Sequence, residues 1–598
     1  MGHAKIEEKE QSLPQWDLSD LYKSIEDPQI NKDLAGAKDH IHHFHETYEN
    51  KVKSLSRQEL LQAIRAYENI DVLLTRPSVY AFLVFASNMQ KTENVVFYQT
   101  IKERVNGLTA SLLFFTLELN EIAEERLKTF CDENKDLAYY RPWLRDVRSF
   151  KPYQLPKDQE KLLHELRIAS QANWVRLHEE TFSGIKFPYA KGNAKTAAEI
   201  LNLMTSPQEE ERKEASIALG KGLKENAALF ALITNTLAKQ KDVEDNWRGF
   251  SAPIQSRNVA NLVEDEVVEA LLDSVRQAYP DLTHRYYKLK AKWMGKKKLA
   301  MWDRNAPLPD RNPQHYSWEE AKDIVLAAYH DFSPEMAAIG QKFFTHNWID
   351  AKVVNGKEPG AFSASTVPEC HPYILTNFFG KTRCVATLAH ELGHGIHQYL
   401  SQSQGALMSD TPLTIAETAS VFGEMLTFKK LLALAKTPGE KKVILAGKVE
   451  DMLNTVVRQV AMCHFEKEVH AARKKQELSP AEIGEIWMKT QSESLGPSVD
   501  LDPHYYAYYW AYIPHFIHTP FYVYAYAFGD CLVNSLYSLY ENGFSNFQTT
   551  YLEMLRLGGR LRYDELLAMF KLNPRHRSFW DGGLSVISQL IDELERLP

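Results

Sequence analysis

The chain has 598 residues, of which 44% are hydrophobic and 25% charged, and its formal net charge is −8. This composition is that of an ordinary globular protein, and the charge is spread along the chain without a strong basic or acidic block. Both observations argue against nucleic acid or an anionic membrane as a partner, and we expect neither.

Cysteine use is low. The five cysteines are widely spaced and form no CxxC pair, which argues against a disulfide framework and against a thiolate zinc site. The longest apolar-looking stretch begins at Phe521 and is broken by Gly529 and Asp530, so it falls short of the roughly 18 apolar residues of a membrane-spanning helix. We therefore expect a cytoplasmic protein.

Helical periodicity dominates the sequence. Apolar residues recur at three- and four-residue intervals in Glu59–Leu74, Val105–Leu127 and Val267–Tyr279, whereas strand-like alternation is rare. The pattern predicts a mostly α fold. A Gly- and Pro-containing passage near residue 190 predicts a boundary between an N-terminal helical region, 1–190, and a second region, 191–598.

The passage from Gly360 to Phe379 departs from the helical pattern. It contains two short β-prone runs that are separated by a Pro-containing turn. We expect these runs to form a small hairpin or sheet edge beside the helix that follows.

That helix carries the pattern His390-Glu391-Leu392-Gly393-His394, an HExxH motif. Residues four apart lie on one face of a helix, so both imidazoles can reach one metal ion while Glu391 projects beside them toward a bound water. Thr382 is predicted to cap the start of the helix.

The bland interpretation of this motif is a helix with two surface histidines and an ordinary glutamate. Two glycines argue against it, because Gly393 and Gly395 each cost about 1 kcal/mol relative to Ala inside a helix. That cost is understandable if another backbone or a substrate approaches closely there. A carboxylate in a second helix is the other argument.

The second helix is predicted to begin with Thr411 as cap and Pro412 at its first position. Glu417 follows His394 after 22 intervening residues, and Glu424 lies nearly on the same, otherwise apolar face. Burying two carboxylates on such a face is costly unless they meet a cation or hydrogen-bond donors. We predict that Glu417 is the third metal ligand and that Glu424 orients a liganding histidine, the alternative being two ordinary helix charges.

One competing ligand scheme fails. The metzincin pattern needs Gly three residues after the second histidine and His three residues further on, but this chain has His397 and Leu400 there. Two imidazoles, one carboxylate and an open position for water are the usual arrangement of hydrolytic zinc, so we expect one Zn²⁺ per chain. Glu391 would accept the proton of the attacking water.

Two segments carry a resemblance to a known family. PGAFSASTVPECHPYILTNFFGKTRCVATLAHELGHGIHQYL and PLTIAETASVFGEML resemble the oligoendopeptidase F branch of the thimet-oligopeptidase-like zinc metallopeptidases. The resemblance covers most of the chain and is strongest from about residue 350 to 530. It implies His390, His394 and Glu417 as metal ligands and Glu391 as general base, in agreement with the reading of the motif.

The resemblance also implies a fold and a substrate class. It implies two helical lobes around a deep substrate channel, a small β-sheet beside the HExxH helix, and cleavage of internal bonds in short peptides. It further implies that Gly360 to Ser363 binds the substrate backbone as an added strand. Members of this branch often have Cys where this chain has Ser363.

The segment from Tyr505 to Phe528 is rich in tyrosine and also contains histidines. We expect most of these tyrosines to pack in the core with their hydroxyls satisfied. The resemblance implies that a histidine and one or two tyrosines of this segment hydrogen-bond the substrate and the oxyanion. The best matches to the motif are His515, Tyr522 and Tyr524, with the alternates His518 and Tyr526.

Two other functions remain open at this point. A zinc exopeptidase of similar helical fold needs a dedicated group for the terminal charge of its substrate, and none is evident in the sequence. A non-catalytic peptide-binding scaffold has no need of a base, so the intact Glu391 argues against it. Oligopeptides are the expected partners, and cobalt or manganese could replace zinc in such a site.

Overall fold

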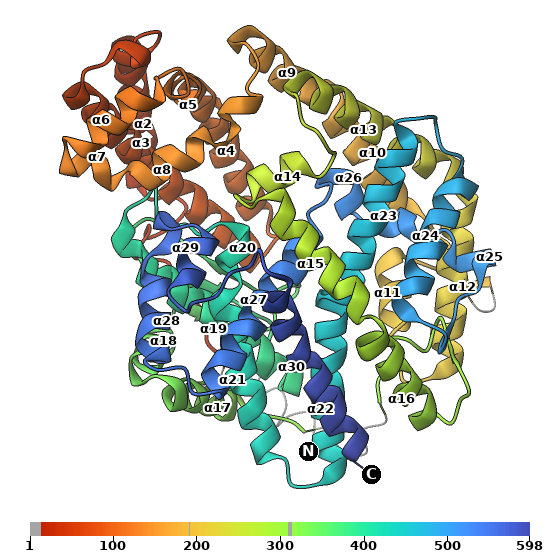
Figure 1. Ribbon diagram of the computed structural model, residues 1–598. Coiled ribbons are helices and arrows are strands. Elements are labelled where there is room, and N and C mark those ends of the chain that lie inside the picture. Colours follow the sequence, from red (N-terminus) through yellow and green to blue (C-terminus); the bar gives the residue numbers. More distant parts are fainter. Residues whose placement is uncertain (1–12, 190–191, 309–313, 598) are drawn as a thin grey trace. The chain divides into compact units, whose positions relative to one another are not determined.

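The computed structural model describes residues 13–189, 192–308 and 314–597. The described chain divides into two compact units, each assembled from three separate stretches. Unit 1 draws on Met1–Lys151, Asn312–Leu434 and Gly543–Lys571, and unit 2 on Pro152–Arg311, Ala435–Asn542 and Leu572–Pro598. Both are built mostly from helices, as predicted (Figure 1). The predicted boundary at 190 falls outside the described residues and stays a prediction.

Unit 1 contains the HExxH motif. Its helices and strands are, in chain order, α2 (Pro28–Tyr48), α3 (Arg57–Ser87), α4 (Thr92–Thr109), α5 (Leu113–Leu119), α6 (Glu124–Asp132), α7 (Lys135–Tyr139), α8 (Arg141–Val147), α17 (Trp318–Phe332), α18 (Pro334–Thr345), β4 (Ile349–Asp350), β5 (Phe362–Ala364), β6 (Tyr373–Leu375), α19 (Thr382–Ser401), α20 (Leu413–Ala416), α21 (Thr418–Leu434), α28 (Phe547–Arg556) and α29 (Tyr563–Ala568).

Unit 2 contains the Tyr- and His-rich segment. Its helices and strands are α9 (Lys157–Ala169), α10 (Gln171–Gly184), β1 (Phe187–Pro188), β2 (Ala194–Lys195), α11 (Ala197–Leu203), α12 (Glu209–Glu225), α13 (Ala227–Arg248), α14 (Gln255–Ala260), α15 (Asp265–Ala278), α16 (Arg285–Trp293), β3 (Leu299–Ala300), α22 (Pro438–Thr455), α23 (Val457–Arg473), α24 (Pro480–Leu495), β7 (Val499–Asp500), α25 (Pro503–Tyr506), η7 (Tyr509–Tyr512), α26 (His515–His518), α27 (Tyr524–Glu541) and α30 (Arg577–Arg596).

Local sequence signals explain several helix starts. Five helices begin with a capping box: α3, α11, α17, α22 and α24. In each, the hydroxyl of a Ser or Thr cap accepts the backbone N–H three residues on, and the Glu at that position accepts the backbone N–H of the cap residue. Of the predicted helices, Glu59–Leu74 lies inside α3 and Val267–Tyr279 matches α15 within two residues. The helical stretch Val105–Leu127 runs from α4 through a short 3-10 helix, Ala110–Leu112, into α5, and a break after Leu119 separates it from α6.

The predicted hairpin is present beside α19. β5 pairs with β6 in antiparallel register, Ser363 opposite Ile374, and β6 pairs with β4 in parallel, giving the order β4-β6-β5. Both β5 and β6 contact α19. β5 is therefore an edge strand of this sheet and contacts the motif helix.

Helix α3 is the single described helix that is long and apolar enough to cross a membrane, judged by length and composition alone. In unit 1 it contributes Leu60, Leu61 and Ile64 to a hydrophobic cluster that also contains Phe44 and Phe115. Packing of this kind is what the core helix of a folded unit shows.

Candidate metal centre and active site

Helix α19 is held on several sides within unit 1. It packs against α21, α17, α18 and α28 (Figure 1). Its inward face buries Val385, Leu388, Leu392 and Ile396 completely. The helix begins at Thr382 with Lys381 as the cap residue, and no side chain caps it. The prediction that Thr382 caps α19 is thus wrong, because the chain already turns into the helix one residue earlier.

The two glycines of the motif mark close contacts, as predicted. A Cβ on Gly393 would lie 2.4 Å from the Ala419 carbonyl oxygen of α21, and one on Gly395 would lie 2.7 Å from the Phe343 ring. The backbones of α19 and α21 therefore meet at Gly393 without room for a methyl group. This contact sets the distance between the two helices that carry the candidate ligands.

Glu417 lies in a break between two helices rather than inside one. It is the C-cap of α20, and its carbonyl accepts the Val421 N–H, which begins the hydrogen bonding of α21. Pro412 is the cap of α20 and Thr411 precedes it, so the predicted start of this helix is displaced by one residue. The break turns the Glu417 side chain toward α19, where the Ser420 hydroxyl donates to its Oε2 at 2.7 Å.

His390, His394 and Glu417 meet at one point. Their ligand atoms lie within 4.8 Å of one another, and no other such trio of His, Cys, Asp or Glu occurs in the described ranges. Glu417 Oε2 is 3.4 Å from His390 Nε2 and 3.3 Å from His394 Nε2. Ligand atoms about 2.05 Å from a tetrahedral zinc ion are about 3.3 Å apart, so both distances from Glu417 match the spacing around that ion.

Glu424 completes the surroundings of His390. Its Oε2 lies 3.3 Å from His390 Nδ1, the nitrogen that faces away from Glu417. A hydrogen bond from Nδ1–H to a carboxylate fixes the tautomer in which Nε2 carries the lone pair for a metal. This is the contact predicted for Glu424.

The charges of the group support one another. Burial would lower the pKa of His390, but the hydrogen bond to Glu424 and the charges of Glu417 and Glu391 raise it to about 9. Burial would raise the pKa of Glu417, but hydrogen bonds and the charges of the two histidines lower it to about 2. Glu417 is thus held as a carboxylate, the form that binds a metal, whereas His390 must release its proton from Nε2 when a metal binds.

Glu391 is more deeply buried than either histidine, with 7% of the residue exposed. Burial is the main cause that raises its pKa, against the opposing charges of His390 and His394 and a hydrogen bond from the Ser363 backbone. A carboxylate with a raised pKa is suited to accept and return a proton near neutral pH. His397, by contrast, packs inside, where burial lowers its pKa to about 3.

Strand β5 is fastened to α19 through Gln398. The Gln398 amide donates to the Ser363 carbonyl at 3.2 Å, and its Oε1 accepts from the Ser363 hydroxyl at 2.8 Å. The Gly360 carbonyl accepts from Asn377 at 3.1 Å. Two carbonyls of the predicted substrate-binding stretch are therefore already engaged, and pairing with a substrate there stays a prediction.

Three supporting residues, Tyr329, Gly423 and Gln398, were missed by sequence reasoning. The Tyr329 hydroxyl of α17 donates to the Ala389 carbonyl at 2.5 Å, next to His390, and Gly423 of α21 leaves room for that ring. Gln398 anchors β5 as described. A buried tyrosine and a glycine on separate helices carry no local signal that they meet, although a glycine inside α21 does suggest a close approach.

The predicted residues of the Tyr- and His-rich segment lie in unit 2. His515 begins α26; its Nε2 lies 3.3 Å from the Tyr526 hydroxyl, and its ring stacks on that of Tyr522 at 5.7 Å. His518 is exposed. Tyr524 is fully buried, and its hydroxyl accepts from Asn261 at 2.9 Å. The structure thus groups His515 with Tyr522 and the alternate Tyr526, while Tyr524 packs in the core.

Comparison with known proteins places this arrangement in a family. A family model described as Peptidase family M3 matches residues 202–585, and one described as Oligopeptidase F matches residues 118–187. Group B oligopeptidase PepB of Streptococcus agalactiae is 27% identical, covering 91% of this chain and 90% of that protein. Oligopeptidase PepF of Bacillus subtilis is 25% identical over 97% of this chain and 87% of its own length.

Solved structures show the same fold. A chain from Chlamydophila abortus superposes with a TM-score of 0.84 at 22% identity, covering 99% of this chain and 98% of that one. Oligoendopeptidase-F from Enterococcus faecium superposes with a TM-score of 0.72 at 20% identity, covering 95% and 99%. Since the family model spans more than half of the sequence, the chain belongs to peptidase family M3, whose members are metal-dependent peptidases.

Proposed function

We propose that this peptidase is a zinc-dependent oligoendopeptidase that hydrolyses internal bonds of short peptides. The observation that carries the proposal is the group of His390, His394 and Glu417, with Glu391 on the same helix. Its donor set and its interatomic spacing fit tetrahedral zinc. Relatives named oligopeptidase or oligoendopeptidase F, matched over most of the chain, support short peptides as substrates.

When bound, the ion would supply Lewis acidity that polarises the scissile carbonyl and makes water nucleophilic near neutral pH. Glu391 accepts a proton from the attacking water and returns it to the leaving amine. Glu424 holds His390 in the tautomer that offers Nε2. Gln398 keeps β5 and the Ser363 N–H beside Glu391, which fixes the orientation of the base.

Donors for the oxyanion and for the substrate backbone are assigned to the Tyr- and His-rich segment. The arrangement of His515, Tyr522 and Tyr526 supports these three side chains as the donors. Tyr524, predicted from the resemblance, has its hydroxyl engaged by Asn261. We therefore favour Tyr526 over Tyr524 for this role. A cytoplasmic location and the absence of nucleic-acid and membrane partners remain predictions from composition.

One experiment tests the proposal. The purified protein is analysed for bound metals and incubated with a mixed peptide library, and the products are identified by mass spectrometry. We expect about one zinc per chain and internal cleavage of short peptides, including peptides blocked at both ends. If blocked peptides resist while their free-ended counterparts are consumed, the protein is an exopeptidase. If purified metal-loaded protein binds peptides without cleaving any, it is a peptide-binding scaffold.

A further inference from the structure

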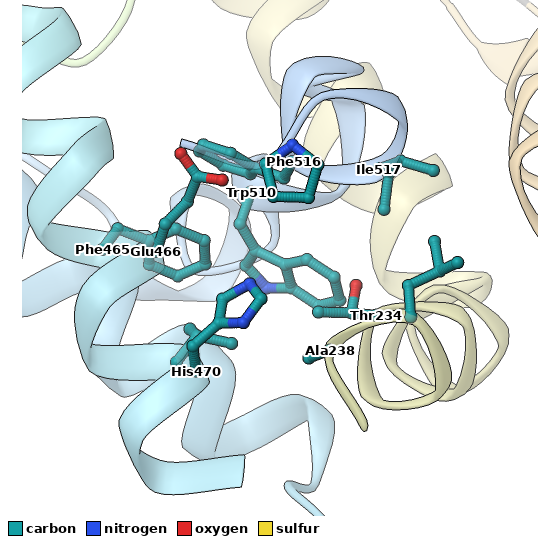
Figure 2. A pocket seen from close by; sticks show the side chains of 11 residues that line it. Thr234, Ala238, Phe465, Glu466, His470, Trp510, Phe516 and Ile517 are labelled. Atoms are coloured by element: carbon teal, nitrogen blue, oxygen red, sulfur yellow. The ribbon is translucent and has the colours of Figure 1, made fainter. Parts of the chain in front are cut away.

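Unit 2 contains a small cavity between α13, α23, η7 and α26 (Figure 2). Its volume is about 20 Å³, which is room for about one water molecule. Most of its lining is apolar, but Glu466, His470 and Trp510 also line it. Glu466 Oε2 and Trp510 Nε1 are buried without a hydrogen-bond partner in the described part of the chain. Such polar atoms in a core call for an explanation.

The other oxygen of Glu466 has a specific task. Glu466 Oε1 accepts the backbone N–H of Phe521 at 2.8 Å, and only 2% of the Glu466 residue is exposed. Phe521 has a φ of 61°, in the left-handed region that bulky residues rarely adopt. A backbone conformation of this kind persists only where the surrounding structure enforces it, and it is often found beside functional sites.

A second side chain holds the same turn from another helix. Arg257 Nε of α14 donates to the Pro520 carbonyl at 3.3 Å. The Phe521 ring packs against that of His470, with centroids 4.9 Å apart. The Glu466 carboxyl of α23 thus accepts the N–H of Phe521, while the Arg257 guanidinium of α14 donates to the C=O of the preceding residue.

The turn leads directly into the candidate substrate donors. Tyr522 follows Phe521 directly. The ring centroids of Tyr522 and Tyr526 lie 5.3 Å apart, and both rings contact the ring of His515. The dihedral angles of Phe521 set the direction in which the chain enters α27. They therefore set where Tyr522 and Tyr526 stand relative to His515.

We propose that Glu466 is a positioning residue: by holding the Phe521 turn in its left-handed conformation it sets the arrangement of His515, Tyr522 and Tyr526 for turnover. This inference rests on the proposed function, in which those side chains donate to the substrate. A water molecule in the cavity would satisfy the second carboxyl oxygen.

The burial of Glu466 also affects how stability depends on pH. Burial raises its pKa to about 8, although the Phe521 N–H and the charges of Arg257 and Lys241 oppose this. Other titratable groups near it are Cys463 and His470 on the same helix, and Asp245, which pairs with Lys241 at 2.9 Å. Because the folded pKa is raised, the stability from the neutral carboxyl is complete below about pH 4.5 and is lost as pH rises through about 8.

The test compares Glu466→Gln and Glu466→Leu in the full-length, zinc-loaded protein, with turnover of a short internally quenched peptide as the readout. Gln keeps a neutral acceptor for the Phe521 N–H, so its kcat at pH 7 should match the unmodified protein. Leu removes the acceptor, and kcat should fall by about 10- to 100-fold with little change in KM or zinc content.

Glu468→Gln on the same helix, where Glu468 pairs with Lys489 at 2.8 Å, is the matched control and should change neither kcat nor its pH profile. An unchanged kcat in Glu466→Leu overturns the inference. So does a Gln variant whose kcat at pH 7 falls as far as that of Glu466→Leu. If the Leu variant does not fold, Glu466→Met, which also lacks an acceptor, is measured in its place. Glu391→Gln distinguishes a failure of this inference from a failure of the proposed function. If Glu391→Gln is inactive while the Glu466 variants behave like the unmodified protein, only the positioning role of Glu466 is wrong.

Discussion

The motif helices of unit 1 and the 514–526 segment of unit 2 present candidate functional side chains in different ways. On α19 the helical repeat alone places His390 and His394 side by side. The contact at Gly393 sets how closely α21 packs against α19. In the segment, a four-residue helix, a left-handed turn and the start of α27 bring His515, Tyr522 and Tyr526 together. The first arrangement is encoded locally, whereas the second depends on side chains of other helices.

The largest expected effect on kcat comes from a residue of the motif helix α19. Glu391→Gln removes the base but keeps the shape of the side chain, so kcat should fall by about 10³- to 10⁴-fold while zinc content is unchanged. Steady-state kinetics and metal analysis on the same preparation measure both. Glu369→Gln, at an exposed position outside α19, is the control. Retained activity in Glu391→Gln would remove Glu391 from its assigned role.

Zinc affinity should distinguish the role of Glu417 from that of Glu424. Glu417→Ala deletes a ligand and should weaken zinc binding by more than about 100-fold, whereas Glu424→Gln only loosens His390 and should weaken it by about 10- to 100-fold. Competition with a chromophoric chelator measures both affinities. Full zinc occupancy of Glu417→Ala after dialysis would exclude Glu417 as a ligand.

The 514–526 segment is tested by removing single tyrosine hydroxyls. Tyr522→Phe and Tyr526→Phe should each lower kcat by about 100-fold if these hydroxyls serve the oxyanion. Tyr524→Phe should leave kcat near normal and lower the free energy of unfolding by about 1–3 kcal/mol, because the buried Asn261 amide loses its acceptor. If Tyr524→Phe instead shows the large loss of kcat with unchanged stability, the original assignment of Tyr524 is right.

The smallest effect concerns the contact between α19 and α21. In Gly393→Ala the new Cβ meets the Ala419 carbonyl at 2.4 Å, which should lower the free energy of unfolding by about 1–3 kcal/mol. Gly36→Ala in α2, where nothing lies within 4 Å, should be neutral or stabilising by up to about 1 kcal/mol. Urea unfolding of both variants measures the difference. Equal stabilities would mean that the two helices can separate at no cost.

How much could be predicted from sequence follows the same division. The histidine pair, the role of Gly393 and the contact of Glu424 with His390 could be foreseen, because helical spacing and the cost of burying charge are local rules. The break at Glu417 could not, since no Gly or Pro lies between Leu413 and Val421 to end one helix and begin another. Helix ends are the least certain part of such predictions.

The register of the tyrosines could not be foreseen for a different reason. Nothing about Phe521 itself announces a positive φ, because glycine or asparagine is the residue expected there. The conformation is enforced by Glu466 and Arg257, which lie 55 and 263 residues away in sequence from the groups they bind. The burial of Tyr524 and the position of Tyr526 beside His515 follow from that turn.

The assembly of unit 1 from three stretches has a consequence for how the protein is made. Helix α28 covers the motif helices: the Tyr551 hydroxyl donates to the Thr418 carbonyl at 2.9 Å, and the Phe547 ring stacks on that of Phe422. These residues leave the ribosome more than a hundred residues after the HExxH motif. A nascent or truncated chain that ends before Gly543 therefore holds every candidate ligand in its sequence but lacks the helix that packs against α19 and α21.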